Sequence, residues 1–168
     1  MRGHVIGVMG AGDDARPEDI EAAFALGEAI ARAGWVLLSG GRNCGIMDAV
    51  NRGAKKGGGL TIGVIPGSDK SSMSDAVDVG IVTGMGSARN YINVLSSDVV
   101  ISCGAGGAGT ASEIALALKS KRPVILFNDR AESEAFFRAI GGARVHVSRS
   151  VEDTIALVRT LLSQARSA

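Results

Sequence analysis

Cysteine, proline and aromatic residues are all scarce in this chain of 168 residues. Its two cysteines, Cys44 and Cys103, stand far apart and in no metal-binding spacing, which argues against a disulfide framework and a zinc site. We therefore predict no metal site. Because aromatic residues make up only 4% of the chain, the core must consist mostly of alanine, valine, isoleucine and leucine.

An excess of charge of one sign is also missing. The chain has 18 basic and 17 acidic residues and a net charge of +1, so bulk charge does not predict binding to nucleic acid or to an anionic membrane surface. No apolar run approaches the roughly 18–20 residues of a membrane span, and the first residues do not resemble a secretion signal. The expected location is therefore the cytoplasm.

Glycine is the residue type that stands out by its abundance. The 24 glycines fall mainly where apolar runs end, so they predict turns and ligand loops, not a low-complexity segment. No change in composition marks a domain boundary, and the length suits one compact unit. We therefore expect a single domain over residues 1–168.

The apolar pattern predicts short strands that alternate with helices. The expected strands are residues 4–9, 36–38, 60–65, 77–82, 98–102, 123–127 and 144–147. Such alternation is typical of an α/β domain, a Rossmann-like, doubly wound, mainly parallel sheet of about seven strands with helices on both faces. The polar segment 67–76 shows no periodicity and is predicted to be a mobile loop or lid.

Four of the predicted strands end in glycine-bearing turns that lead toward helices. The turns are residues 10–12, 40–45, 84–86 and 104–109. In a doubly wound sheet, ligands bind beyond the carboxyl ends of the strands. The turns therefore predict one shared ligand pocket, although glycines also occur in turns that bind nothing.

The turn within residues 103–113 is the most informative of the four, since its sequence is Cys-Gly-Ala-Gly-Gly-Ala-Gly-Thr-Ala-Ser-Glu. Between a strand and a helix it presents bare backbone N–H groups at the positive end of the helix dipole, where a phosphate binds favourably. Glu113 has two interpretations: it stabilises the helix dipole, or its carboxylate orients sugar hydroxyls or acts on a glycosidic carbon.

Two arginines strengthen the prediction of an anion site. Arg42 lies in the second turn, and Arg89 follows Ser87, a predicted N-cap, in the first turn of a helix. A cation there opposes the helix dipole, and a bound phosphate would remove that penalty. The alternative for Arg89 is an ion pair with a carboxylate such as Glu113.

Residues 104–109 also match the spacing Gly-x-Gly-x-x-Gly of dinucleotide-binding turns. That fingerprint belongs to the first strand–helix unit and is followed about 20 residues later by an acidic residue. Here the corresponding position is Val124, within a predicted strand. NAD is therefore not expected as a ligand.

At this point the motifs resemble a known family. Gly-Gly-Ala-Gly-Thr-Ala-Ser-Glu at 106–113 resembles the PGGxGTxxE signature of the Lonely Guy family, nucleoside 5′-monophosphate phosphoribohydrolases that activate cytokinins. Residues 40–47 resemble that family's GGxxGLM segment, and Arg89 resembles its catalytic arginine. The superfamily also includes lysine-decarboxylase-like proteins, but no pyridoxal-phosphate constellation surrounds Lys119 or Lys121.

The chain departs from these hydrolases at several positions. Ala105 stands where the signature has proline, Asn90 follows Arg89 in place of lysine, and Ser112 replaces the first glutamate of a pair that ends at Glu113. The segments Gly-Met-Gly-x-Ala-Arg-Asn and Gly-Thr-x-Ser-Glu-Ile-Ala-Leu-Ala-Leu are instead similar to the branch of molybdenum cofactor carrier proteins.

The resemblance to that branch implies a non-enzymatic protein that binds and carries molybdenum cofactor (molybdopterin) or a related phosphorylated pterin, with phosphate or a nucleotide as the other ligands to consider. It also implies a homo-oligomer, a dimer or tetramer, with molybdoenzymes or cofactor-synthesis proteins as partners. The alternative is a nucleoside 5′-monophosphate phosphoribohydrolase, in which Arg89 and Glu113 would be catalytic. The expected ligand-binding residues are Gly10, Gly12, Gly40, Gly41, Arg42, Asn43, Gly84, Gly86, Ser87, Arg89, Asn90, Gly104, Gly106, Gly107, Gly109, Thr110 and Glu113.

Overall fold

The computed structural model describes residues 3–104 and 106–165. In chain order these form β1 (Val5–Gly10), α1 (Pro17–Arg32), β2 (Val36–Ser39), α2 (Gly45–Lys56), β3 (Thr61–Ile65), β4 (Val79–Val82), η1 (Gly86–Arg89), α3 (Asn90–Leu95), β5 (Val99–Cys103), α4 (Ala108–Lys119), β6 (Val124–Phe127), α5 (Ala131–Gly141), η2 (Gly142–Arg144), β7 (Val145–Ser148) and α6 (Val151–Ala165). The elements η1 and η2 are short 3₁₀ helices. Ala105, where the sequence departs from the signature proline, lies outside the described residues.

The seven strands form one sheet in the order β4-β3-β2-β1-β5-β6-β7, and every neighbouring pair is parallel. The predicted doubly wound α/β fold is therefore confirmed. From β1 the chain builds the sheet outward to β4 and then returns to β5 on the other side of β1. The direction reverses between β1 and β5, which is the point where ligands bind in such sheets.

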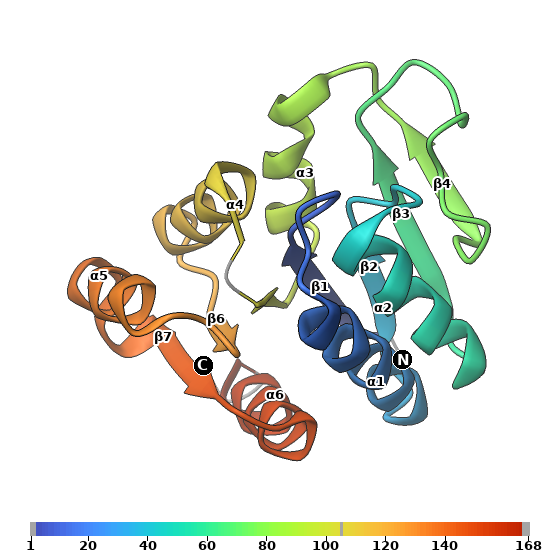
Figure 1. Ribbon diagram of the computed structural model, residues 1–168. Coiled ribbons are helices and arrows are strands. Elements are labelled where there is room, and N and C mark those ends of the chain that lie inside the picture. The colour runs from blue at the N-terminus through green and yellow to red at the C-terminus, as the bar shows by residue number, and fades with distance from the viewer. Residues whose placement is uncertain (1–2, 105, 166–168) are drawn as a thin grey trace.

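Helices cover both faces of the sheet (Figure 1). One core lies between the strands and α1, α2 and α6, and it includes Ile6, Leu26 and Ile101. The other lies beneath α3, α4 and α5 and includes Val100, Ile114 and Leu126. Successive β5 side chains alternate between the two cores, as a pleated strand requires.

Helices α1 and α2 approach so closely that glycine is required at the contact. A Cβ placed on Gly27 would lie 2.1 Å from the carbonyl oxygen of Val50, and one on Gly53 would lie 1.9 Å from that of Phe24. Backbone atoms cannot move aside as side chains do. The small residues of these helices therefore set the distance between them.

The crossover from β3 to β4 contains no helix, and β4 is shorter than predicted because Val77 and Asp78 precede it. Asp78 accepts hydrogen bonds from the backbone N–H and the hydroxyl of Thr61, each at 3.0 Å, and so fixes the entry to the strand. β4 lies at the edge of the sheet, where Val79 and Ile81 are exposed.

The segment that includes residues 67–76 is fastened to the turn after β2. The backbone N–H of Asn43 donates to the carbonyl of Ser72 (2.8 Å), that of Ser74 donates to the carbonyl of Gly41 (2.9 Å), and Arg42 and Met73 form an antiparallel bridge. The segment is a loop, as predicted, and these contacts make it a support for that turn; its predicted mobility stays a prediction.

The prediction of an N-cap at Ser87 is wrong. Met85 holds the N-cap position of η1, and Ser87 lies within that 3₁₀ helix, where its side chain makes no capping hydrogen bond. Gly86 adopts a φ of 53°, which turns the chain one residue earlier than the sequence suggested.

Among the described helices, none is long and apolar enough to cross a membrane.

Candidate functional site

A cavity of about 740 Å³ lies at the carboxyl edge of the sheet, around the reversal between β1 and β5. The loops that follow β1, β2, β3 and β5 supply its wall together with η1 and the first turns of α4. These segments are far apart in the sequence and meet only because their strands are parallel neighbours. Its lining consists of Met9, Gly10, Ala11, Gly12, Asp14, Gly40, Arg42, Met47, Pro66, Gly86, Ser87, Arg89, Asn90, Gly106, Gly107, Ala108, Gly109, Thr110, Glu113 and Arg130.

All four predicted glycine turns reach this region, but four of the residues expected to bind ligand do not line the cavity: Gly41, Asn43, Gly84 and Gly104. Gly41 packs against Gly63 and Ile65, and Gly104 packs against the carboxylate of Asp19. Both have positive φ values, 73° and 74°. Their structural task is therefore the turn itself, while the other members of the predicted set surround the cavity.

Several residues in the lining had not been singled out as ligand-binding: Met9, Ala11, Asp14, Met47, Pro66, Ala108 and Arg130. Met9, Ala11 and Ala108 are immediate neighbours of predicted residues, so their place beside the glycine turns is the sequence signal for them. Arg130 carried no such signal. It stands just before α5, beyond a strand with no glycine turn, and only the packing of α5 beside α4 brings it to the cavity.

The loop before α4 supplies an open cradle of backbone amides. A Cβ on Gly107 or on Gly109 would meet no heavy atom within 4 Å, so the backbone there is accessible from the cavity. α4 begins at Ala108, and its first turn has no acidic residue and no side-chain cap. Its free N–H groups and the positive end of the helix dipole therefore face the cavity with no acidic side chain in that turn.

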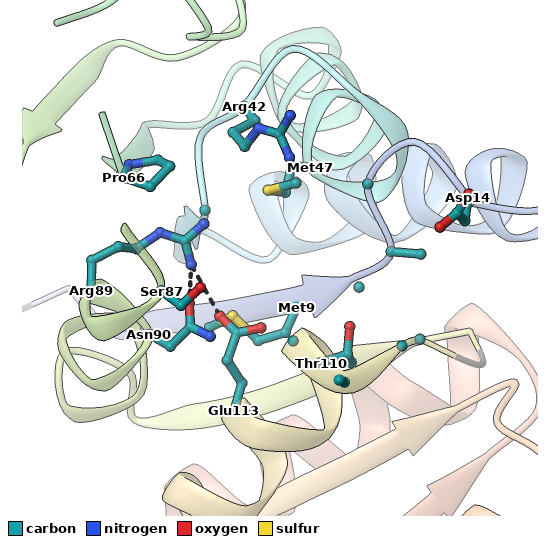
Figure 2. A pocket seen from close by; sticks show the side chains of 18 of the residues that line it. Met9, Asp14, Arg42, Met47, Pro66, Ser87, Arg89, Asn90, Thr110 and Glu113 are labelled. Carbon is teal, nitrogen blue, oxygen red and sulfur yellow. Dashed lines mark hydrogen bonds and ion pairs between the residues drawn. The ribbon is translucent and has the colours of Figure 1, made fainter. Parts of the chain in front are cut away.

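Arg89 of η1 and Glu113, one turn further along α4 from this cradle, form a buried ion pair (Figure 2). Nη1 of Arg89 lies 3.4 Å from Oε1 of Glu113, and both side chains are at most 10% exposed. Asn93 donates from Nδ2 to the same oxygen at 3.0 Å. The carboxylate is thus oriented by Arg89 of η1 and Asn93 of α3, and the ion pair that the sequence offered as the alternative for Arg89 is present.

Asn90 extends this network toward α4. Nη1 of Arg89 donates to Oδ1 of Asn90, and Nδ2 of Asn90 donates to Oγ of Ser112 at 3.1 Å. Two of the positions at which the sequence departs from the hydrolase signature, Asn90 and Ser112, are therefore in direct contact. One hydrogen bond between them replaces the lysine and glutamate that the hydrolase pattern carries there.

Burial dominates the electrostatics of the pair. Desolvation lowers the pKa of Arg89, and the nearby charge of Arg42 lowers it further, while Glu113 opposes the shift. Burial also raises the pKa of Glu113, against the effects of the Asn93 hydrogen bond and of Arg89. Nε of Arg89 is buried and finds no acceptor in the described part of the chain. An anion bound in the cavity would supply the acceptor that Nε of Arg89 lacks.

Arg42 and Arg130 complete the cationic lining. Arg42 is partly exposed and lies 3.7 Å from the mainly exposed carboxylate of Asp13, a weak, solvent-screened pair. Arg130 is exposed at the rim. Together with Arg89 they give the cavity three arginines against the carboxylates of Asp14 and Glu113, so its lining favours an anionic ligand.

Neither thiol lines this cavity. Cys103 is buried in the core beneath α1, where burial raises its pKa to about 12. Cys44 precedes α2 and borders a groove between α1 and α2, and burial raises its pKa as well. Within the described ranges, no cluster of three or more histidine, cysteine, aspartate or glutamate side chains is arranged to hold a metal ion.

Residues 3–155 match the model of the SLOG cluster4 family, and the chain belongs to this family. The predicted relation to the Lonely Guy superfamily and its carrier branch is borne out by this match and by solved structures. The molybdenum cofactor binding protein from the phototrophic bacterium Rippkaea orientalis is 52% identical, with a TM-score of 0.94 over 96% of this chain and 99% of that one.

The molybdenum cofactor carrier protein of Chlamydomonas reinhardtii is 48% identical, with a TM-score of 0.92 over 96% of this chain and 99% of that one. A shorter match links the chain to the other branch. Over 50 residues, 30% of this chain and 27% of the relative, it is 50% identical to a cytokinin riboside 5′-monophosphate phosphoribohydrolase of Mycobacterium marinum.

Proposed function

We propose that this member of the SLOG cluster4 family binds molybdenum cofactor in the 740 Å³ cavity and carries it without chemical change. The observation that carries the proposal is the near-complete structural match to molybdenum cofactor carrier proteins at about half sequence identity. The cationic cavity at the sheet reversal is consistent with it, since the cofactor is a phosphorylated pterin. Function at this level of detail lies in the site and not in the fold.

The cradle before α4 is the proposed position of the phosphate. Gly107 and Gly109 leave their backbone open, and the first N–H groups of α4 provide donors with the helix dipole behind them. Arg89, which lines the same cavity and whose Nε has no acceptor among the described residues, supplies a charge-assisted donor. Arg42 adds a second charge from the turn after β2.

The arrangement suits storage better than turnover. The carboxylate of Glu113 already accepts from Asn93 and pairs with Arg89, and burial raises its pKa. Its proposed task is to hold the guanidinium in place. Contacts that hold a bound ligand and a transition state equally well give affinity without catalysis, and we assign the contacts of this pair to that kind.

Copurification tests the proposal directly. The protein is expressed in a host that makes molybdenum cofactor, purified, and oxidised so that any bound pterin becomes fluorescent. We expect bound pterin with the wild-type chain and much less with Arg89→Met. The same chain from a host unable to make the cofactor is the blank. If neither copurification nor binding of added cofactor is seen, the proposal is wrong.

A second candidate function is hydrolysis of the N-glycosidic bond of a nucleoside 5′-monophosphate. It is favoured by the partial match to the M. marinum hydrolase and by the position of Glu113, a carboxylate that lines the cavity beside an arginine. Such a carboxylate can stabilise an oxocarbenium-like transition state. Release of free base from a panel of nucleoside monophosphates, lost in Glu113→Gln, would establish this activity.

Self-association and delivery are part of the proposal. The outer faces of α3 and α5 expose Tyr91, Leu95, Phe136 and Ile140, which are apolar surfaces of the kind that dimers and tetramers bury. We propose a homo-oligomer that passes its cargo to molybdoenzymes or receives it from cofactor-synthesis proteins. Light scattering on the purified chain decides between monomer, dimer and tetramer, and Tyr91→Glu with Phe136→Glu should shift it toward monomer.

A further inference from the structure

A second, smaller cavity of about 340 Å³ adjoins the first. It lies between α4 and α5, which are neighbours on the same face of the sheet (Figure 1). Gly106, Thr110 and Arg130 line both cavities. The cradle proposed for the phosphate therefore separates two spaces, and a ligand anchored there can extend into either.

A buried hydroxyl without a partner stands in the wall of this second cavity. Ser102 is on β5, is fully buried, and its Oγ makes no hydrogen bond with any described residue. Leaving such a group unsatisfied costs about 1–3 kcal/mol. A side chain that makes no bond within the protein but borders a cavity is placed to bond with a ligand.

The rest of the lining is apolar on one side and acidic on the other. Ala111, Ile114 and Phe137 provide the apolar surface, and Asp129 and Glu132 provide carboxylates. The shared Arg130 is the cavity's one cation in the described chain. A second phosphate would be repelled by the two carboxylates. For a flat ring, the cavity provides an apolar surface against the face of the ring and hydrogen-bond acceptors at its edge.

Asp129 retains acceptor capacity for such an edge. Its Oδ1 accepts from the backbone N–H of Arg130 at 2.8 Å, and its Oδ2 accepts from Oγ of Ser133 at 2.9 Å. A carboxylate has about four lone-pair positions, so both oxygens remain able to accept. Two parallel N–H groups on neighbouring atoms of a heterocycle can donate to the two oxygens at once, in the bidentate geometry that a guanidinium uses with a carboxylate.

We propose that the cavity between α4 and α5 is a second subsite that binds a flat nitrogen heterocycle, with Ser102 and Asp129 at its polar edge. The ring class is the 2-amino-4-oxopyrimidine edge that pterins and guanine share. This inference deepens the proposed function and rests on it: the phosphate of the ligand occupies the cradle before α4, and its ring extends beneath α5.

The experiment measures what the ring adds to the binding of the phosphate. The probes are 6-hydroxymethylpterin monophosphate, followed by its fluorescence anisotropy, and glycerol 3-phosphate, which has no ring, measured as a competitor. For the wild-type chain we expect the pterin probe to bind at least about 10-fold more tightly, which is the effect of one or two hydrogen bonds and stacking.

Two variants test the hydroxyl and the space of the subsite, and a third tests its carboxylate; none of the three residues lines the first cavity. Ser102→Ala removes only the unpartnered hydroxyl, so the melting temperature should stay unchanged or rise while the affinity for the pterin probe falls by about 2- to 10-fold. Ala111→Leu fills the space and should make the two probes equal. Both variants should bind glycerol 3-phosphate as the wild type does. Asp129→Asn should weaken binding of the pterin probe and leave binding of glycerol 3-phosphate unchanged.

The outcomes separate the subsite from the proposed function. If the wild type binds the pterin probe and Ser102→Ala binds it equally well with unchanged preference over glycerol 3-phosphate, the subsite is disproved while the carrier function stands. If the wild type shows no preference for the ring, the subsite is disproved as well. Failure of cofactor both to copurify and to bind when added, together with binding of the pterin probe that Ser102→Ala weakens, would disprove the carrier function alone.

Discussion

Glycine performs opposite tasks in two regions of this molecule. Between α1 and α2, Gly27 and Gly53 are in contact with the backbone of the facing helix, and a Cβ would lie 1.9–2.1 Å from a carbonyl oxygen. At the cavity, Gly107 and Gly109 face open space, with no heavy atom within 4 Å of a Cβ. The first pair is needed for packing, and the second leaves open the backbone that we propose binds the ligand. The same residue type therefore predicts loss of stability in one region and loss of binding in the other.

The largest effect should follow from Gly53→Ala. The added methyl group collides with the backbone of Phe24, which cannot move without separating the helices, so we expect a loss of about 3 kcal/mol in the free energy of unfolding, the upper end of the usual cost of overpacking. Urea denaturation measures it. Gly107→Ala is the matched control and should change stability little, because its φ of −85° is ordinary for alanine. Equal losses in both variants would contradict the comparison.

Arg89→Met should have the next largest effect, on binding. It removes the cavity's buried guanidinium, and a hydrogen bond to a charged group contributes about 1.5–3 kcal/mol, or roughly a 10- to 150-fold change in affinity for a phosphorylated pterin. Arg144→Met removes the same charge from an exposed position in η2 and should leave affinity unchanged. A similar loss in both variants would mean that net charge alone governs binding.

Gly109→Ala should separate the two tasks within one variant. Gly109 lies in the first turn of α4, where alanine is the better helix former by up to about 1 kcal/mol, so the melting temperature should rise slightly. The methyl group enters the cavity and should lower the affinity for a phosphorylated pterin several-fold. Fluorescence anisotropy and thermal denaturation on the same sample give both numbers. A variant that is more stable and binds normally would show that the cradle does not contact the ligand.

The smallest effect concerns pH. Burial raises the pKa of Glu113, so the folded state holds this proton more tightly than the unfolded state, in which the pKa is about 4.3. The contribution is fully favourable below the unfolded value and is lost as pH rises through the raised value. We therefore expect the stability of the wild type relative to Glu113→Gln to fall with rising pH across that window. Denaturation curves at several pH values test this, and a constant difference would contradict it.

The glycine turns illustrate how much of the site could be predicted. Residues such as Gly12, Gly40 and Gly106 were expected in one pocket because parallel strands deliver their carboxyl ends to one edge, and they line one cavity. Gly41 and Gly104 have the same sequence signal but pack against the protein. Whether a glycine faces a ligand or a neighbouring chain segment depends on side chains from other elements, such as Ile65 and Asp19.

Arg130, Ser102 and Asn93 show what sequence reasoning could not reach. None belongs to a recognisable motif. Arg130 reaches the cavity only because α5 packs beside α4. Ser102 lies in an apolar strand, whose pattern does not show that its hydroxyl has no partner. Asn93 orients Glu113 from a separate helix. Local patterns carry no information on such contacts, because they depend on how distant elements are oriented against one another.

By itself the sequence determined the α/β class, the seven strands, the parallel sheet and the edge at which the glycine turns open onto a cavity. Period and turn chemistry are local properties that short stretches of chain carry. Only the tertiary structure decided that β1 and β5 are neighbours, that Arg89 is buried against Glu113, and that the loop before α4 separates two cavities. Those features arise from packing between residues distant in the chain, where shape and burial select among many arrangements that local patterns allow.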